Sequence, residues 1–188
     1  MILSLTAVLT AWSGFEASKW GGEMSIAFSQ ASSARIQAAS AQATAQAARQ
    51  YDLSIYTEWV LAQANGDEAL SQHIEQRFSD EFAVAFDAWN EQERAASGPF
   101  AMDEYVPPGT VEAEKLGERA DEKFDQALTN NQRGDNYSLL TVLFALVLFF
   151  AALSQSQRVL WRRHAFLGLA LVLGVAGVVV LLTFPIKI

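Results

Sequence analysis

Two long apolar runs dominate the pattern of hydrophobic and polar positions in the last third of the chain. They cover residues 137–154 and 165–186, and neither contains a charged side chain. A helix rises ~1.5 Å per residue, so these runs would reach ~27 and ~33 Å, against a hydrocarbon core of ~30 Å. The pattern predicts a hairpin of two transmembrane helices.

A shorter apolar stretch covers residues 1–15. It lacks the basic flank of a secretory signal peptide, although Ala11-Trp12-Ser13 resembles a weak processing site. Continued as a helix to Trp20, it would be ~30 Å long and would place a tryptophan at the level of an aromatic belt. We expect a retained first transmembrane helix over residues 1–20, with a cleaved signal peptide as the alternative.

Small residues then recur in alternating steps of four and three. The series consists of Ala27, Ala31, Ala34, Ala38, Ala41, Ala45 and Ala48. A stripe that repeats every 3.5 residues faces a partner helix along its length, and alanine lets two backbones approach closely. We expect a long helix over about residues 16–64, whose coiled-coil-like seam joins copies of the chain in a homo-oligomer. The alternative is that alanine is simply abundant in this segment.

Towards the N-terminus the same repeat passes through Trp20, Ser13 and Thr10. The helix is therefore expected to leave the membrane without a break.

A second helix is expected over about residues 67–94. Asn65-Gly66-Asp67 combines a helix stop with a cap for the next helix. Four aromatic residues then follow at helical spacing, namely Phe78, Phe82, Phe86 and Trp89. Aromatic side chains in this arrangement are more often part of a packed core than of a cofactor site, so we expect them to pack on the neighbouring helices.

The segment 95–109 contains three of the four prolines in the chain and is expected to be extended. A third helix is expected over about residues 110–136, with Thr110 as its cap, and to continue directly into the second span. The predicted fold is therefore all-α, with three transmembrane helices and an extramembrane helical bundle over residues 16–136.

Charge is divided as sharply as hydrophobicity. All 21 acidic residues lie between Glu16 and Asp135, where nine basic residues accompany them. The extramembrane segment therefore carries a formal charge of about −12 and offers no basic stripe, which excludes a nucleic-acid partner. The chain has no cysteine, so disulfides, thiolate catalysis and cysteine metal sites are excluded as well.

Basic residues gather instead in the connection between the last two spans. Arg158, Arg162 and Arg163 lie within residues 155–164. Cytoplasmic loops carry an excess of lysine and arginine, so we expect this loop in the cytoplasm and the acidic domain on the other side of the membrane.

No catalytic, cofactor or metal site is expected. His73 has Arg77 four residues later, and an arginine at the neighbouring position on a helix disfavours a bound cation. A membrane-anchored hydrolase would need a nucleophile or a metal centre, and the sequence indicates neither. The carboxylates of the third helix are interpreted as a solvated face.

A group of polar residues stands at the start of the second span. It consists of Asn130, Asn131, Arg133, Asp135, Asn136 and Tyr137. We expect these side chains to form an interfacial belt among the lipid headgroups, with Tyr137 as the aromatic anchor. If copies of the chain surround an axis, the belt would ring its entrance.

Several segments together resemble a group of uncharacterised bacterial membrane proteins. The resemblance is carried by Trp12-Ser13-Gly14, Trp20, the Ala/Gln-rich helix, Phe100-Ala101-Met102 with Tyr105, Arg133-Gly134-Asp135-Asn136-Tyr137 and the basic hairpin. It implies one N-terminal span, a helical extramembrane region, a C-terminal two-span hairpin and a bacterial cytoplasmic membrane. It implies no activity, cofactor or site residue.

The expected function is that of a non-enzymatic, homo-oligomeric integral membrane protein that acts as a scaffold or assembly module in the lipid bilayer. The alternative is an oligomeric channel or pore. Its axis would be lined by the polar residues of the first span, namely Ser4, Thr6, Thr10 and Ser13.

Overall fold

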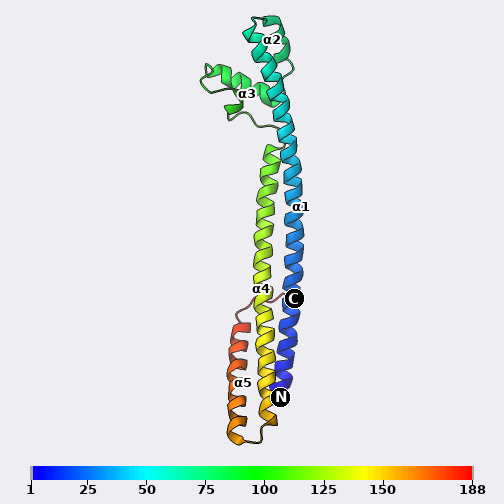
Figure 1. Ribbon diagram of the computed structural model, residues 1–188, viewed down its shortest axis with the longest axis vertical. Coiled ribbons are helices and arrows are strands. Elements are labelled where there is room, and N and C mark those ends of the chain that lie inside the picture. Colours follow the sequence, from blue (N-terminus) through cyan, green and yellow to red (C-terminus); the bar gives the residue numbers. More distant parts are fainter. Residues whose placement is uncertain (1, 188) are drawn as a thin grey trace. The chain divides into compact units, whose positions relative to one another are not determined.

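The computed structural model describes residues 2–187 and confirms the all-helical prediction, since this range contains no strand (Figure 1). Its elements are α1 (Ile2–Ala64), α2 (Glu68–Glu75), α3 (Asp80–Glu91), the 3-10 turn η1 (Pro99–Ala101), α4 (Thr110–Ser156) and α5 (Leu160–Leu181). The chain divides into two compact units. We call Met1–Ala31 with Glu122–Ile188 the apolar unit and Ser32–Asp121 the acidic unit.

Within residues 2–187, two helices are long and apolar enough to cross a membrane, α4 and α5. The helix that begins at Thr110 continues without a break into the apolar run that begins at residue 137. The last helix begins and ends about five residues earlier than predicted. Arg162 and Arg163 therefore belong to its first turn, and Pro185 follows in a non-helical segment because proline cannot continue a helix.

α1 is a continuous helix because no proline interrupts it, and its buried positions follow one repeat. In the apolar unit the repeat passes through Thr6, Ser13, Trp20 and Ala27. In the acidic unit it passes through Ala34, Ala41, Asp52, Trp59 and Ala62. When the buried and half-buried positions between these residues are included, every step is three or four residues, so one side of the helix stays covered along its length.

In each unit α1 lies side by side with α4 (Figure 1). In the apolar unit, Gly134 of α4 faces Trp20, and a Cβ on it would come 3.5 Å from the carbonyl oxygen of Ala17. Gly14 of α1 faces Thr141, further along α4. Residues of α1 therefore pair with residues of α4 in reverse order, which makes the two helices antiparallel.

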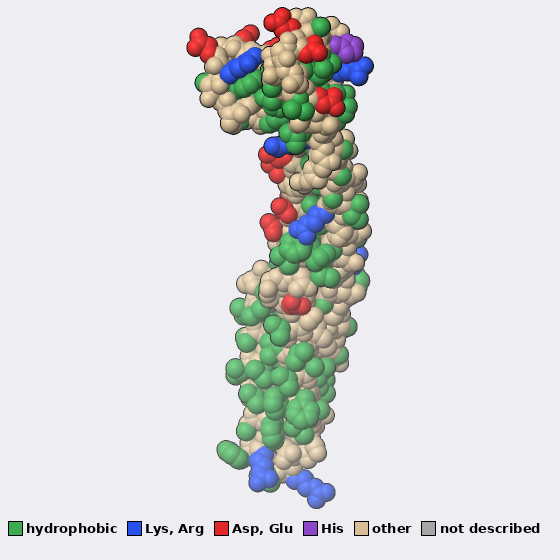
Figure 2. All heavy atoms as spheres, turned by 45° about the horizontal axis from the view of Figure 1, so that its top comes forward, with side chains coloured by type: hydrophobic (Ala, Val, Ile, Leu, Met, Phe, Trp, Pro, Cys, Tyr) green, Lys and Arg blue, Asp and Glu red, His purple; other side chains and the backbone are tan. Residues whose placement is uncertain are grey.

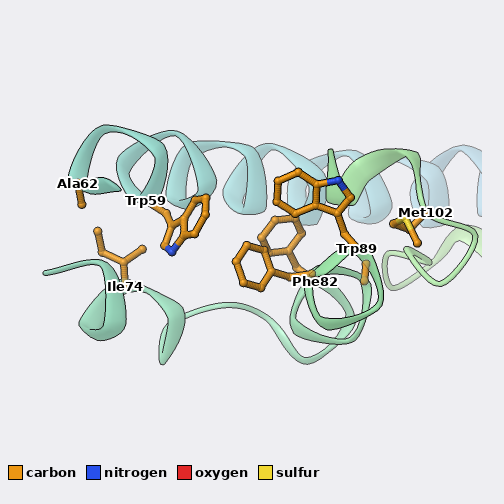
Figure 3. Packing of buried hydrophobic residues seen from close by; sticks show 8 residues of the cluster. Trp59, Ala62, Ile74, Phe82, Trp89 and Met102 are labelled. Carbon is orange, nitrogen blue, oxygen red and sulfur yellow. The ribbon is translucent and has the colours of Figure 1, made fainter. Parts of the chain in front are cut away.

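The core of the acidic unit is aromatic. Trp59 of α1 packs with Phe82, Phe86 and Trp89 of α3 (Figure 3). Perpendicular ring contacts dominate, such as that of Trp59 with Phe86, whose centroids are 5.0 Å apart. Trp59 Nε1 also donates a hydrogen bond to Glu75 Oε1 at 2.7 Å, which joins α1 to α2. The predicted role of the aromatic stripe as core is confirmed.

The single helix predicted over residues 67–94 is divided into α2 and α3. α3 begins directly after Ser79, whose hydroxyl caps the helix by accepting a hydrogen bond from Phe82 N at 3.2 Å. The aromatic residues keep their helical spacing across the interruption between α2 and α3, so the sequence pattern does not reveal it. The segment 95–109 is irregular apart from the turn η1.

Gly109 is expected to be the least replaceable glycine of the acidic unit. Its φ is +92°, and a Cβ on it would come 2.4 Å from the backbone carbonyl oxygen of Ala41. Gly109→Ala should therefore lower the free energy of unfolding by about 1–3 kcal/mol, measured by chemical denaturation in mild detergent.

Gly117→Ala is the matched control. Gly117 lies inside α4, and a Cβ on it would meet no atom within 4 Å. Alanine there should raise stability by about 0.5–1 kcal/mol, because glycine in a helix loses more entropy on folding. Similar effects of the two substitutions would contradict the close approach of Gly109 to α1.

Candidate functional site

The alanine seam is covered inside a single chain. Ala27, Ala31, Ala34 and Ala41 are buried, and the other three seam alanines are half-buried. In the acidic unit the covering element is the start of α4, where Gly109 meets the backbone of Ala41. No second chain is therefore needed to cover the seam, and the association of copies through it stays a prediction.

The predicted belt does not form one surface. Asn130 and Tyr137 are buried, whereas Asn131 and Asp135 are exposed and hydrogen-bonded to each other at 3.1 Å. Asn136 is half-buried and accepts a hydrogen bond from Gln132 at 3.2 Å. The six residues occupy different sides of α4, so they cannot all ring one entrance.

Tyr137 is a core residue rather than an interfacial anchor. Its side chain is fully buried, and its hydroxyl donates a hydrogen bond to the carbonyl oxygen of Pro185 at 3.0 Å. Its ring meets that of Phe184 at a centroid distance of 5.5 Å. The residues that follow α5 therefore fold back over α4, which the sequence pattern did not indicate.

The same C-terminal segment reaches α1. The backbone N–H of Lys187 donates a hydrogen bond to Glu16 Oε2 at 2.8 Å. The ammonium of Lys187 pairs with Glu23 Oε1 at 3.3 Å. Glu16 is fully buried, although its position at the start of the acidic segment predicts a solvated side chain.

Three buried polar atoms beside this contact have no hydrogen-bond partner. They are Ser13 Oγ, Glu16 Oε1 and Trp20 Nε1, which lie on one side of α1. Each unsatisfied buried group costs about 1–3 kcal/mol. Two cations flank the indole, since Arg133 lies 4.6 Å and Lys187 5.8 Å from its ring centroid. We call these five residues the boundary cluster.

The sequence held a signal for this cluster. The heptad repeat through Ser13 and Trp20 places Glu16 beside the covered side of α1, where a carboxylate is unusual. An acidic residue at such a position is a stronger indication of a site than the polarity of a loop.

The polar residues of the proposed first span face into the apolar unit. Thr6 and Ser13 are buried, and the hydroxyl of Thr10 donates a hydrogen bond to the carbonyl oxygen of Thr6 at 2.8 Å. Ser4 is exposed. Three of the four residues assigned to a pore lining are therefore covered, fully or in part, by the chain itself.

The arginine-rich connection is exposed. Arg158, Arg162, Arg163 and His164 are all exposed, and Trp161 retains 76% of its accessible surface. Figure 2 shows basic side chains gathered at one end of the apolar unit, next to a surface covered by hydrophobic side chains. The topology-setting residues thus form a charged end on this unit.

A groove of about 400 Å³ lies between the end of α1 and α2 in the acidic unit. We call it the distal groove. Its lining residues are Ile55, Glu58, Leu61, Ala62, Asn65, Asp67, Leu70, His73, Ile74 and Arg77. The apolar floor is thus bordered by charges of both signs. Asp67 is already engaged as the cap of α2 through Leu70 N.

His73 lies on this groove without partner ligands. Within residues 2–187, no group of three or more histidine, cysteine, aspartate or glutamate side chains is arranged to hold a metal ion.

Asp52 forms a buried polar network in the acidic unit. It is 1% exposed and accepts hydrogen bonds from Ser79 Oγ at 2.7 Å and from the Tyr105 hydroxyl at 2.9 Å. Burial raises the pKa of Tyr105 well above its ordinary value, and the hydrogen bond to the Asp52 carboxylate raises this pKa further. The network joins α1, the start of α3 and the irregular segment.

Comparisons of the chain with protein-family models, with curated proteins and with solved structures found no match.

Tyr105 should make the stability of the acidic unit depend on alkaline pH. Its folded-state pKa is raised above the ordinary 10.0, so its contribution is fully present below pH 10.0 and is lost as the pH rises through the folded-state pKa. Tyr105→Phe should lower the free energy of unfolding by about 1–3 kcal/mol at neutral pH, because Asp52 loses a hydrogen-bond donor. The free energy of unfolding of this variant should also fall less steeply as the pH rises above 10. Denaturant unfolding on either side of pH 10 measures both effects.

Tyr51→Phe is the control for this measurement, because Tyr51 is 52% exposed. An alkaline loss that is as steep in Tyr105→Phe as in the parent chain would contradict the role of Tyr105.

Proposed function

We propose that this protein is a non-enzymatic integral membrane scaffold with three spans per chain. Its acidic unit lies outside the bilayer, and copies of the chain associate through the distal groove. The arginine-rich connection lies in the cytoplasm, as the distribution of basic residues favours. The bacterial cytoplasmic membrane as its location rests on the resemblance of the sequence to bacterial membrane proteins.

The two sides of α1 support the first span. Leu5, Val8, Trp12 and Phe15 are exposed, whereas Ser13 and Glu16 are buried. In water the opposite arrangement would be expected, with apolar side chains inside and polar ones outside. A helix with apolar side chains outward and polar side chains inward fits a hydrocarbon environment.

The distal groove is the observation that carries the assembly function. Glu58 of α1 provides a negative charge on its border, His73 lies on α2, and Arg77 lies in the turn that follows α2. Within residues 2–187, none of these three forms an ion pair. A surface with both signs of charge around an apolar floor can pair with itself about a two-fold axis, so that each carboxylate meets the cation of the partner.

Apolar residues of the groove itself are exposed. Leu61 and Leu70 line it and retain 58% and 46% of their accessible surface. Contiguous apolar side chains on a solvated unit are typical of contact surfaces between proteins.

A charge exchange tests the assembly. Glu58→Arg and Arg77→Glu should each weaken the association of copies by about tenfold, because each places like charges opposite one another. The double variant should restore it. The oligomeric state is measured by light scattering in mild detergent. Glu112→Arg makes the same change of charge on exposed α4, outside the groove, and should have no effect.

A parent chain that is monomeric over the whole concentration range would contradict the proposal. An equal loss of association in Glu112→Arg would also contradict it, because the effect would then follow net charge rather than the groove.

Single cysteines test the topology, since the chain has none of its own. Ile36→Cys, at a position 72% exposed, should react with a membrane-impermeant maleimide in intact cells. Trp161→Cys should react only after permeabilisation. Val8→Cys should not be labelled in native membranes, although Val8 is 65% exposed in the structure, because lipid would cover it.

If Val8→Cys were labelled as fast as Ile36→Cys, the proposal that the first span crosses the membrane would be wrong. Labelling of Trp161→Cys in intact cells would reverse the orientation.

A further inference from the structure

An apolar groove of about 280 Å³ lies in the apolar unit between α1, α4 and α5. Leu5 and Leu9 line it from α1, Val147 from α4, and Gly174 and Val178 from α5. Thr6 is its one polar lining residue, and the side chain of Thr6 is buried. In a membrane this groove lies in the hydrocarbon region, where acyl chains rather than water fill a lateral opening.

The groove and the boundary cluster lie along the same side of α1. Leu9 lies one turn before Ser13, and Glu16 follows Ser13 after three residues. Leu9 and Val178 also pack against the hydrophobic cluster of Trp20 and Tyr137. Leu9 and Val178 thus belong both to the lining of the apolar groove and to the packing around Trp20, whose indole N–H has no partner.

The unpartnered atoms define the chemistry of a ligand. Glu16 Oε1 requires a donor, and Trp20 Nε1 requires an acceptor. The hydroxyl of Ser13 can serve either. One ligand that satisfies all three must carry a donor and an acceptor close together.

The flanking charges specify the ligand further. Arg133 lies over the face of Trp20, and within residues 2–187 it forms no ion pair. A guanidinium without a carboxylate partner is suited to bind phosphate oxygens. The carboxylate of Glu16 is suited to bind an ammonium group.

We propose that the apolar unit binds one phospholipid with a primary-amine headgroup. Its ammonium lies at Glu16 and Ser13, its phosphate accepts from Trp20 Nε1 and Arg133, and one acyl chain lies in the apolar groove. Residues 182–187 cover the cluster in the lipid-free chain, because Lys187 N–H occupies Glu16 Oε2. Binding therefore requires this segment to move aside. The inference rests on the first span of the proposed function, but not on assembly.

Retention of lipid by the full-length protein tests the proposal. The protein is purified from nanodiscs that contain phosphatidylethanolamine, phosphatidylcholine or phosphatidylglycerol, and bound lipid is counted by native mass spectrometry. Phosphatidylethanolamine should be retained about tenfold better than either of the others, as expected when charge-assisted hydrogen bonds are lost. Free phosphoethanolamine, which lacks acyl chains, should not displace it.

Glu16→Gln removes the charge with little change of shape and should abolish this preference. Glu23→Gln is its control, since Glu23 pairs with Lys187 but has no unpartnered buried atom. Gly174→Leu should fill the groove and lower retention of all three lipids. Val172→Leu, at an exposed position on the same helix, should leave retention unchanged.

Equal retention of the three headgroups, or an unchanged preference in Glu16→Gln, would overturn the proposal. A loss in Gly174→Leu without an effect of Glu16→Gln would also overturn it, because only the acyl chain would then be recognised. If Glu16→Gln fails to fold by circular dichroism, Ser13→Ala takes its place, with the same expected loss of preference, because Ser13 also faces the ammonium group. Glu58→Arg should not change lipid retention, so failure of the assembly proposal is distinguishable.

Discussion

The structure depends on the close packing of α1 against α4, which keeps one side of α1 covered within each unit. The repeat of 3.5 residues stays constant along α1, while the chemistry at the covered positions changes. Threonine and serine occupy it in the apolar unit, alanine follows, and Asp52 and Trp59 occupy it near the end of the helix. The spacing of the covered positions thus determines how α1 packs against α4. The residue types at those positions determine the role of each segment of α1.

The covered side of α1 could be predicted from the sequence, but its partner could not. Alanine spacing is a local pattern and identifies the seam directly. The helix that covers Ala41 begins at Gly109 and Thr110, far along the chain, and a flat alanine surface accepts a helix of its own chain as readily as one from another copy. The break before Ser79 was hidden for a related reason, because the aromatic spacing continues across it.

Glu16 and Asp52 show why buried carboxylates escape a sequence analysis based on composition. Both are fully buried on α1, although carboxylates are ordinarily solvated. Asp52 accepts hydrogen bonds from two hydroxyl groups, which compensate for its burial and connect α1 to Ser79 and Tyr105. Glu16 receives one backbone donor and keeps one oxygen without a partner. Satisfied polar groups specify a core, whereas unsatisfied ones mark a place where something else can bind.

The alanine seam also determines where the acidic unit opens most easily. A buried methylene contributes ~0.8 kcal/mol, so alanine at Ala34 and Ala41 holds α4 with far less burial energy than Trp59 holds α3. The backbone N–H groups of α1 near these alanines are therefore expected to exchange with solvent deuterium sooner than those near the aromatic core. In the acidic unit, local opening is therefore expected most often where α1 packs on α4 and least often at the aromatic core.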